Sequence, residues 1–200
     1  LAATWKSAFT ADLAGDLMPQ RLQGTADLAV TQATGSFQEA GGFAARLATE
    51  LDPKQVKQLG VTFTKGNATL GAITVSGPFD AATREGRLKL NVTGIGNELL
   101  SLVGSRFGIY FGSTRLAAEY DIELKQQGRY VNTTGALTVD KLSVTRNQLT
   151  TPVIDFRLGY SATVDLPHTN ATVRTFTIDA LQSGRPLLKA GLTRELVLDW

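Results

Sequence analysis

The feature that most constrains this chain is a regular alternation of apolar and polar residues, seen most clearly in residues 151–167, TPVIDFRLGYSATVDLP. Every second position from Ile154 to Leu166 is apolar, and polar residues or glycine stand between them. Side chains of a β-strand point alternately to its two faces, so the pattern predicts a strand with one apolar and one polar face. At about 3.3 Å per residue the strand would be roughly 45 Å long, more than twice the usual length.

Similar alternation recurs along the whole chain, punctuated by glycine-containing turns such as Lys65-Gly66-Asn67 and Gln127-Gly128. Short connections of this kind favour antiparallel hairpins arranged as a meander. We therefore expect an all-β, mostly antiparallel domain over residues 1–200, built on a long, twisted and bent sheet that forms a groove or an open taco-like or sandwich-like architecture. The expected strands lie near 2–13, 22–32, 42–51, 61–76, 85–93, 114–125, 129–146, 152–166, 171–182 and 186–199.

Two of these segments change the phase of their alternation once. In NATLGAITVSG the apolar positions switch parity at Gly71, and in ALTVDKLSV they switch at Asp140-Lys141. An extra residue in one strand produces such a switch, so we expect a β-bulge at each place. Bulges bend and twist a sheet, as a curved trough requires.

Only two segments have helical signals. DPKQVKQLGV, residues 52–61, offers Asp52 as a cap and Pro53 in the first turn, and IGNELLSLVG, residues 95–104, offers Asn97 as a cap. We expect one or two short helices here. Their spacing of about 45 residues suggests weak repeat units over 40–93 and 94–200, and two unrelated helical connectors explain the spacing equally well.

Composition excludes several classes of protein. The net charge is +2 with both signs interspersed, so no basic patch is available for nucleic acid. No apolar run reaches the roughly 18 residues that a membrane-spanning helix needs, and the absence of cysteine removes thiolate chemistry. Both ends carry strand-like sequence, from which we expect a segment of a longer protein.

Candidate catalytic groups are few, and we expect no enzymatic activity and no cofactor or metal. The one histidine, His168, lies in an expected hairpin tip, and a zinc site needs more His or Cys than the chain has. Glu119, Asp121 and Glu123 share one strand face. A carboxylate pair could serve a glycosidase in principle, but three acids beside Lys125 are more typical of a solvated surface.

The apolar strand faces have two interpretations. Two sheets can close face to face as a β-sandwich, which is the commoner use of such strands. Alternatively, one bent sheet can leave its apolar face open for a ligand with acyl chains. Alternation is the same in both cases, and the strand length favours the open sheet, because strands of sandwiches are usually five to eight residues long.

Three stretches also resemble a known family: KLNVTGIGNELLSLVG, TRLAAEYDIELKQQGRYVNTTGALTVDKLSV and TPVIDFRLGYSATVDL. Their order, over roughly residues 40–200, is similar to that of the AsmA-like superfamily of Gram-negative envelope proteins, which includes TamB-like and YhdP-like proteins. The resemblance implies a periplasmic, groove-shaped β structure that supports phospholipid transport between inner and outer membranes, without cofactor. It also implies an inner-membrane anchor outside this chain, and envelope protein partners of unknown identity.

On this hypothesis the lipid-binding residues contact acyl chains of a phospholipid or similar ligand. The residues expected to line the groove are Ile154, Phe156, Leu158, Tyr160, Val164, Leu166, Leu116, Tyr120, Ile122, Leu124, Leu88, Leu90 and Val92. The alternative function is that of a non-catalytic β-sandwich scaffold or adhesion module of a bacterial envelope or surface protein.

Overall fold

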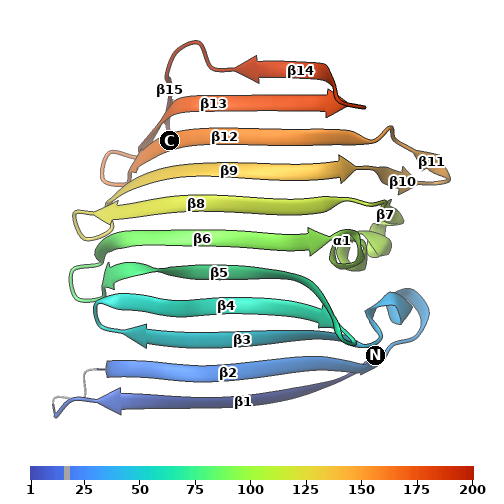
Figure 1. The fold of residues 1–200 in the computed structure, drawn as a ribbon. Coiled ribbons are helices and arrows are strands. Elements are labelled where there is room, and N and C mark those ends of the chain that lie inside the picture. The colour runs from blue at the N-terminus through green and yellow to red at the C-terminus, as the bar shows by residue number, and fades with distance from the viewer. Residues whose placement is uncertain (16–18) are drawn as a thin grey trace.

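The computed structural model describes residues 1–15 and 19–200, in which twelve strands form one antiparallel sheet (Figure 1). Neighbours in sequence are neighbours in the sheet, in the order β1-β2-β3-β4-β5-β6-β8-β9-β12-β13-β14, and β15 also pairs with β13. The strands are β1 (Ala2–Leu13), β2 (Pro19–Gln32), β3 (Phe43–Asp52), β4 (Gln55–Lys65), β5 (Ala68–Asp80), β6 (Glu85–Gly96), β8 (Arg115–Lys125), β9 (Tyr130–Leu142), β12 (Ile154–Asp165), β13 (Asn170–Gln182), β14 (Arg185–Gly191) and β15 (Leu196–Asp199). The expected antiparallel all-β class is confirmed.

The remaining elements lie beyond one end of the long strands (Figure 1). The connection from β6 to β8 contains α1 (Asn97–Gly104), η2 (Ser105–Phe107) and β7 (Ile109–Phe111), and that from β9 to β12 contains β10 (Val144–Arg146) and β11 (Leu149–Thr150). These short strands form a second sheet in the order β11-β10-β7, and α1 packs on β7. A 3₁₀ helix, η1 (Gly35–Ala40), joins β2 to β3.

The strands are long, as the alternation predicts. Most strands of the large sheet have 10 to 14 residues, and the expected strand 152–166 is the 12-residue β12. At about 3.3 Å per residue β12 spans roughly 40 Å. The sheet is therefore extended both along its strands and across them, and its strands are about twice the usual length.

The expected helix over 52–61 is wrong. Asp52 caps a turn rather than a helix, since its Oδ1 accepts a hydrogen bond from the Lys54 backbone N at 3.0 Å, and β4 begins at Gln55. Here β4 pairs with β3 on one side and β5 on the other. Tertiary pairing on both edges overrides the local helix signals. The helix that supported one of the two repeat units is therefore absent.

The helix over 95–104 is confirmed as α1, of eight residues, but Asn97 is not its cap. Gly96 occupies the N-cap position, and no side chain caps the helix there. Some strand bounds also differ from those expected. The segment 61–76 divides into β4 and β5 at the Gly66-Asn67 turn, 129–146 divides into β9 and β10, and 186–199 divides into β14 and β15.

Both expected bulges are confirmed. Phe63 pairs with Gly71 and Thr64 with Thr69, which leaves Leu70 as the extra residue of β5. Gly71 has a φ of 145°, a conformation that favours glycine. In β9 the extra residue falls at Asp140-Lys141, because Leu142 pairs with Ile154 and Val139 with Phe156.

The large sheet is open, with β1 at one edge and β14 and β15 end to end at the other. The accessible surface of the chain, 12,937 Å², exceeds the value of about 9,100 Å² expected for a compact 21.4 kDa protein. Among the described residues, the buried apolar side chains are Ala26, Leu70, Ile95, Ala118 and Ala180. Most apolar side chains are thus only partly covered, unlike those in the core of a closed sandwich.

Candidate functional site: the apolar face of the sheet

A single row of directly paired residues crosses the whole sheet from β1 to β13. Directly paired residues in antiparallel strands project to the same face, so every member of the row lies on one side. The row is Phe9, Gly24, Thr49, Leu59, Val75, Leu90, Tyr120, Gly135, Tyr160 and Phe176. The apolar sides of these strands therefore lie on the same side of the sheet.

We call this side the apolar face. Parallel rows above and below bring further large side chains onto it, for example Leu47, Val61 and Ile73 in the row that continues to Leu158 and Ile178. The bulges maintain this arrangement by shifting β5 and β9 back into phase with their neighbours. The apolar face is thus continuous across the long strands.

Twelve of the thirteen predicted site residues lie on this face as parts of three strands, and their side chains are half-buried. Those of β6 and β8 are brought together directly, since Leu88 pairs with Ile122 and Leu90 with Tyr120. Leu166 lies in the turn after β12 and is exposed. Those of β12 are separated from β8 by β9, so the predicted residues form two groups, which meet where the rings of Tyr120 and Tyr160 approach each other across β9.

The prediction omitted the strand that joins the two groups. Val131, Leu137 and Val139 of β9 lie between β8 and β12 on the same face. It also omitted the equivalent positions of β1 to β5, although Phe43, Leu47 and their neighbours alternate in the sequence as clearly as those of β12. Alternation was the available signal, and in β9 it is weak because the apolar residues stand among glycine and threonine.

Aromatic rings cover glycines at two points on the apolar face. The rings of Tyr120 and Tyr160 lie on either side of Gly135, with centroids 6.1 Å apart, and the ring of Phe9 lies over Gly24. A Cβ on either glycine would overlap these rings. The backbone therefore forms the floor of shallow sites that the neighbouring aromatic side chains fill.

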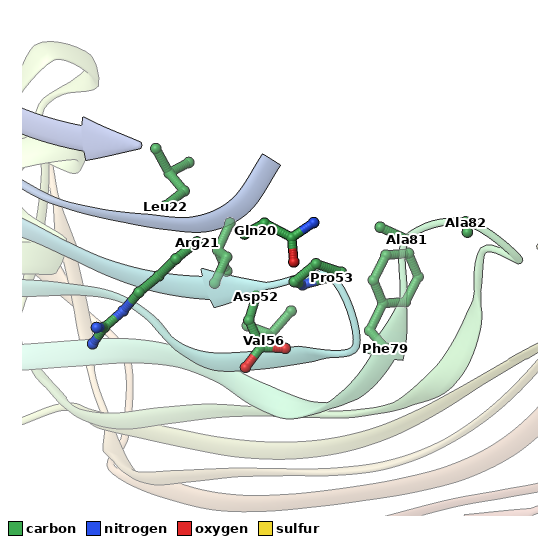
Figure 2. Close-up of a pocket in the computed structure, with 10 residues that line it drawn as sticks. Gln20, Arg21, Leu22, Asp52, Pro53, Val56, Phe79, Ala81 and Ala82 are labelled. Carbon is green, nitrogen blue, oxygen red and sulfur yellow. The ribbon is translucent and has the colours of Figure 1, made fainter. Parts of the chain in front are cut away.

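One end of the apolar face forms a pocket of about 480 Å³ (Figure 2). It lies where β2 begins and where the β3–β4 and β5–β6 turns meet, and hydrogen bonds from Phe79 N to Lys54 O (3.0 Å) and from Ala81 N to Pro53 O (2.8 Å) join these turns. Its volume lies within the range of small-molecule sites. The lining residues, none of which was predicted, are Gln20, Arg21, Leu22, Leu51, Asp52, Pro53, Val56, Phe79, Ala81 and Ala82.

The opposite face carries the charges. Glu123 accepts from Lys125 Nζ at 2.9 Å, Asn132 Nδ2 at 3.0 Å and Arg87 Nη2 at 2.9 Å. These bonds, with that of Lys125 the strongest influence, lower the pKa of Glu123 to about 2. Lys125, which the sequence places beside the three acids, is thus a partner of Glu123, and Arg87 of β6 is another.

A second cluster on the charged face gathers around Glu50. Its Oε1 lies 2.8 Å from Arg21 Nη2 and 3.4 Å from Lys57 Nζ, and the hydrogen bond from Arg21 is the main reason that the pKa of Glu50 is lowered. Lys57 also lies 3.4 Å from Asp52. Both clusters consist of paired, ionised groups, so the two faces of the sheet differ sharply in polarity.

The candidate catalytic groups have structural partners. His168 is exposed in the turn after β12, as expected, and its Nδ1 lies 2.8 Å from Asp165 Oδ2. A lowered pKa makes Glu123 a poor general acid near neutral pH. Within residues 1–15 and 19–200, no cluster of three or more His, Asp or Glu side chains is placed to hold a metal ion, and no helix has the length and apolarity to span a bilayer.

Comparison with known proteins finds no matching family model, curated protein or solved structure. The geometry of the site consists of a charged face and a broad, half-exposed apolar face that ends in an apolar pocket.

Proposed function

We propose that this chain is the lipid-binding segment of a periplasmic AsmA-like protein and that its apolar face holds the acyl chains of phospholipids during transport between the inner and outer membranes. The role is non-enzymatic. The residues of β6, β8 and β12 predicted from the sequence would contact acyl chains, together with the β9 residues that lie between them.

The observation that supports this proposal is the continuous apolar face with no second layer packed on it in the described structure. Side chains on this face remain partly accessible although they are large and apolar. Contiguous apolar patches of this extent on a protein typically mark ligand, protein or membrane contacts. An acyl chain suits the surface because it is long and flexible and because each CH₂ that it buries contributes about 0.8 kcal/mol.

The pocket supports the same proposal. Leu22, Leu51, Val56 and Phe79 lie on the apolar face, so an acyl chain that lies along the face can end in this hollow. Polar lining groups such as Arg21 and Asp52 are engaged with Glu50 and Lys57 on the charged side. The pocket thus favours a hydrocarbon end rather than a charged head group.

Photolabelling tests the proposal without changing the protein. The purified chain is incubated with a phosphatidylethanolamine that carries a diazirine in one acyl chain, irradiated and digested, and the labelled residues are located by mass spectrometry. We expect label on the apolar face, for example on Leu90, Tyr120 and Leu158. Their immediate neighbours on the charged face, Lys89, Asp121 and Arg157, are matched internal controls and should carry none.

Equal labelling of both faces, or no labelling above that of an unrelated β protein, contradicts the proposal. A second measurement uses the pair Leu90→Ser and Lys89→Ser, which change adjacent residues on opposite faces. Lipid recovered with the Leu90→Ser variant should decrease severalfold, whereas recovery with Lys89→Ser should equal that of the parent. If neither substitution lowers the amount of lipid recovered, the result favours a scaffold or adhesion role.

A further inference from the structure

The edge strand β1 is unusually open to pairing. All twelve of its residues are exposed, and β2 is its only strand neighbour in the described sheet. Natural edge strands are usually short or protected by proline, lysine or a bulge. The opposite edge has such protection, since Pro186 and Lys189 lie in β14 and residues 192–195 interrupt the edge before β15. In β1 the charged residues are one lysine, Lys6, and one acid, Asp12, proline is absent, and the pairing with β2 is irregular only near the two ends, at Ala2/Ala3 and Asp12/Leu13.

The side chains of β1 define which strand could pair with it. Trp5, Phe9 and Leu13 project from the apolar face and are 62%, 50% and 54% exposed. Lys6 and Asp12 project from the charged face, six residues apart. A partner strand must therefore present apolar residues on one face, and an acid opposite Lys6 and a base opposite Asp12 on the other.

A second copy of β1 meets these requirements in one antiparallel register. When a two-fold axis passes through Phe9, Phe9 faces its own copy, and Lys6 faces Asp12 of the second copy. The symmetry repeats this ion pair, so one register forms it twice. The same register places Trp5 opposite Leu13 of the second copy. Moving the axis to Ser7 instead sets Lys6 opposite an alanine, Ala8, and loses both ion pairs.

Within the part of the chain that the structure describes, neither Lys6 nor Asp12 forms an ion pair. Within its own sheet Lys6 lies opposite Asp27, whose carboxylate is 3.8 Å from Arg46 Nε, and Asp12 lies opposite Arg21, which bonds Glu50. Each neighbouring opposite charge thus has a partner of its own, so a second copy can engage Lys6 and Asp12.

We propose that two copies of this chain associate through β1 in this register, which joins their sheets edge to edge and makes the two apolar faces continuous. Pairing of residues 5–13 adds about eight to ten backbone hydrogen bonds. The association is independent of the proposed lipid binding and is tested in lipid-free buffer.

Charge exchange gives the sharpest test. We expect the parent to be dimeric by sedimentation velocity, and Lys6→Glu and Asp12→Lys each to weaken dimerisation by roughly tenfold or more, because like charges then face each other twice. The two single variants mixed in equal amounts should form a heterodimer, since all facing charges are again opposite. The double variant Lys6→Glu/Asp12→Lys should also dimerise. Folding defects in the single variants cannot produce this recovery.

Cysteine cross-linking tests the register. The chain contains no cysteine, so single replacements report one position each. Phe9→Cys places the two thiols at the two-fold axis, within the 4.4–6.8 Å Cα separation of disulfides, and should cross-link rapidly under mild oxidation. Ser7→Cys and Ala11→Cys lie on the same face of the same strand but roughly 13 Å from their copies in this register, and they should remain monomeric on a non-reducing gel.

Three results overturn the proposal. A parent that sediments as a monomer up to about 100 μM, well above the dissociation constants of specific complexes, excludes the dimer. If neither charge substitution changes the affinity of the dimer, the two copies associate by stacking their apolar faces instead. Growth into filaments indicates pairing of β1 with the opposite edge of the next copy, because such a head-to-tail contact does not close.

Discussion

The rings of Tyr120 and Tyr160 lie with their centroids 6.1 Å apart although their strands, β8 and β12, are not neighbours. The strand between them, β9, contributes Gly135 at this point, which pairs directly with both tyrosines. The absence of a side chain on Gly135 lets the two rings approach over the backbone, and the hydroxyl of Tyr160 lies 3.1 Å from that of Thr133. This contact joins three strands at the middle of the apolar face.

Gly135→Ala should therefore destabilise the protein. A Cβ at this position would overlap the Tyr120 ring and come within 2.8 Å of the Tyr160 ring. Displacing two rings should lower the free energy of unfolding by about 1–3 kcal/mol, measured by urea denaturation. Gly159→Ala is the matched control on the adjacent strand, because its Cβ would meet only the Thr177 hydroxyl at 3.1 Å and Gly135 O at 3.9 Å. Equal losses for both variants would contradict the role of the rings.

Glu123 should make stability depend on pH. Its pKa is lowered from 4.5 to about 2 in the folded protein by Lys125, Asn132 and Arg87. A lowered folded-state pKa adds stability that is complete above the unfolded-state pKa and is lost as pH falls through the folded-state value. The urea midpoint of the parent should therefore exceed that of Glu123→Gln above about pH 5, and the difference should shrink between pH 4.5 and 2.

The control for this experiment is Glu119→Gln, on the same strand face but outside the cluster around Glu123. We expect its urea midpoint to follow that of the parent at each pH. A constant difference between the parent and Glu123→Gln across the whole range would show that the ion cluster does not stabilise the folded state.

Replacing Lys141, in the bulge of β9, with glycine should stabilise the folded protein. Lys141 has a φ of 52°, which costs an L-residue about 1–2 kcal/mol. Its backbone N donates to Asp155 Oδ1 at 2.7 Å, and glycine retains this bond. After the greater chain entropy of unfolded glycine is subtracted, Lys141→Gly should raise the free energy of unfolding by about 0.5 kcal/mol. Lys89→Gly, in the regular part of β6, should lower it by roughly 1 kcal/mol. A loss at both sites would contradict this account.

Filling the pocket should weaken lipid binding if the proposed function holds. Val56→Phe enlarges a side chain that lines the pocket, and displacing one or two CH₂ groups of an acyl chain should weaken binding roughly tenfold. Titration with a fluorescent fatty acid measures the change. Thr62→Phe enlarges a residue of the same strand on the charged face, and should bind as the parent does. Unchanged affinity in Val56→Phe would exclude the pocket as an acyl-chain site.

Much of the sheet was predictable because alternation is a local property. The apolar side of β12 was evident from Ile154 to Val164, and both bulges were visible as phase changes around Gly71 and Lys141. The segment 52–61 was not predictable in the same way. Asp52 and Pro53 are as suitable for a turn as for a helix start, and only pairing with β3 and β5 makes the following residues a strand.

The candidate site was predictable in kind but not in extent. The sequence indicated the apolar sides of β6, β8 and β12, whereas Val131 and Leu137 of β9 were omitted because two apolar residues around glycine and threonine form a weak pattern. The pocket was also missed, since Leu22, Val56 and Phe79 come from three separate strands. Its lining depends on where two turns meet, which no local pattern indicates.

The sequence by itself determined which side of each strand is apolar, because successive side chains of an extended chain point in opposite directions. Only the tertiary structure decided that these sides form one open surface. Strand register aligned Leu90, Tyr120 and Tyr160 in a single row, and the order of the strands placed β1 at one edge of the described sheet and β14 and β15 at the other. Alternation is identical whether an apolar face meets a second sheet or is left open, so the difference depends on long-range pairing that the local pattern does not contain.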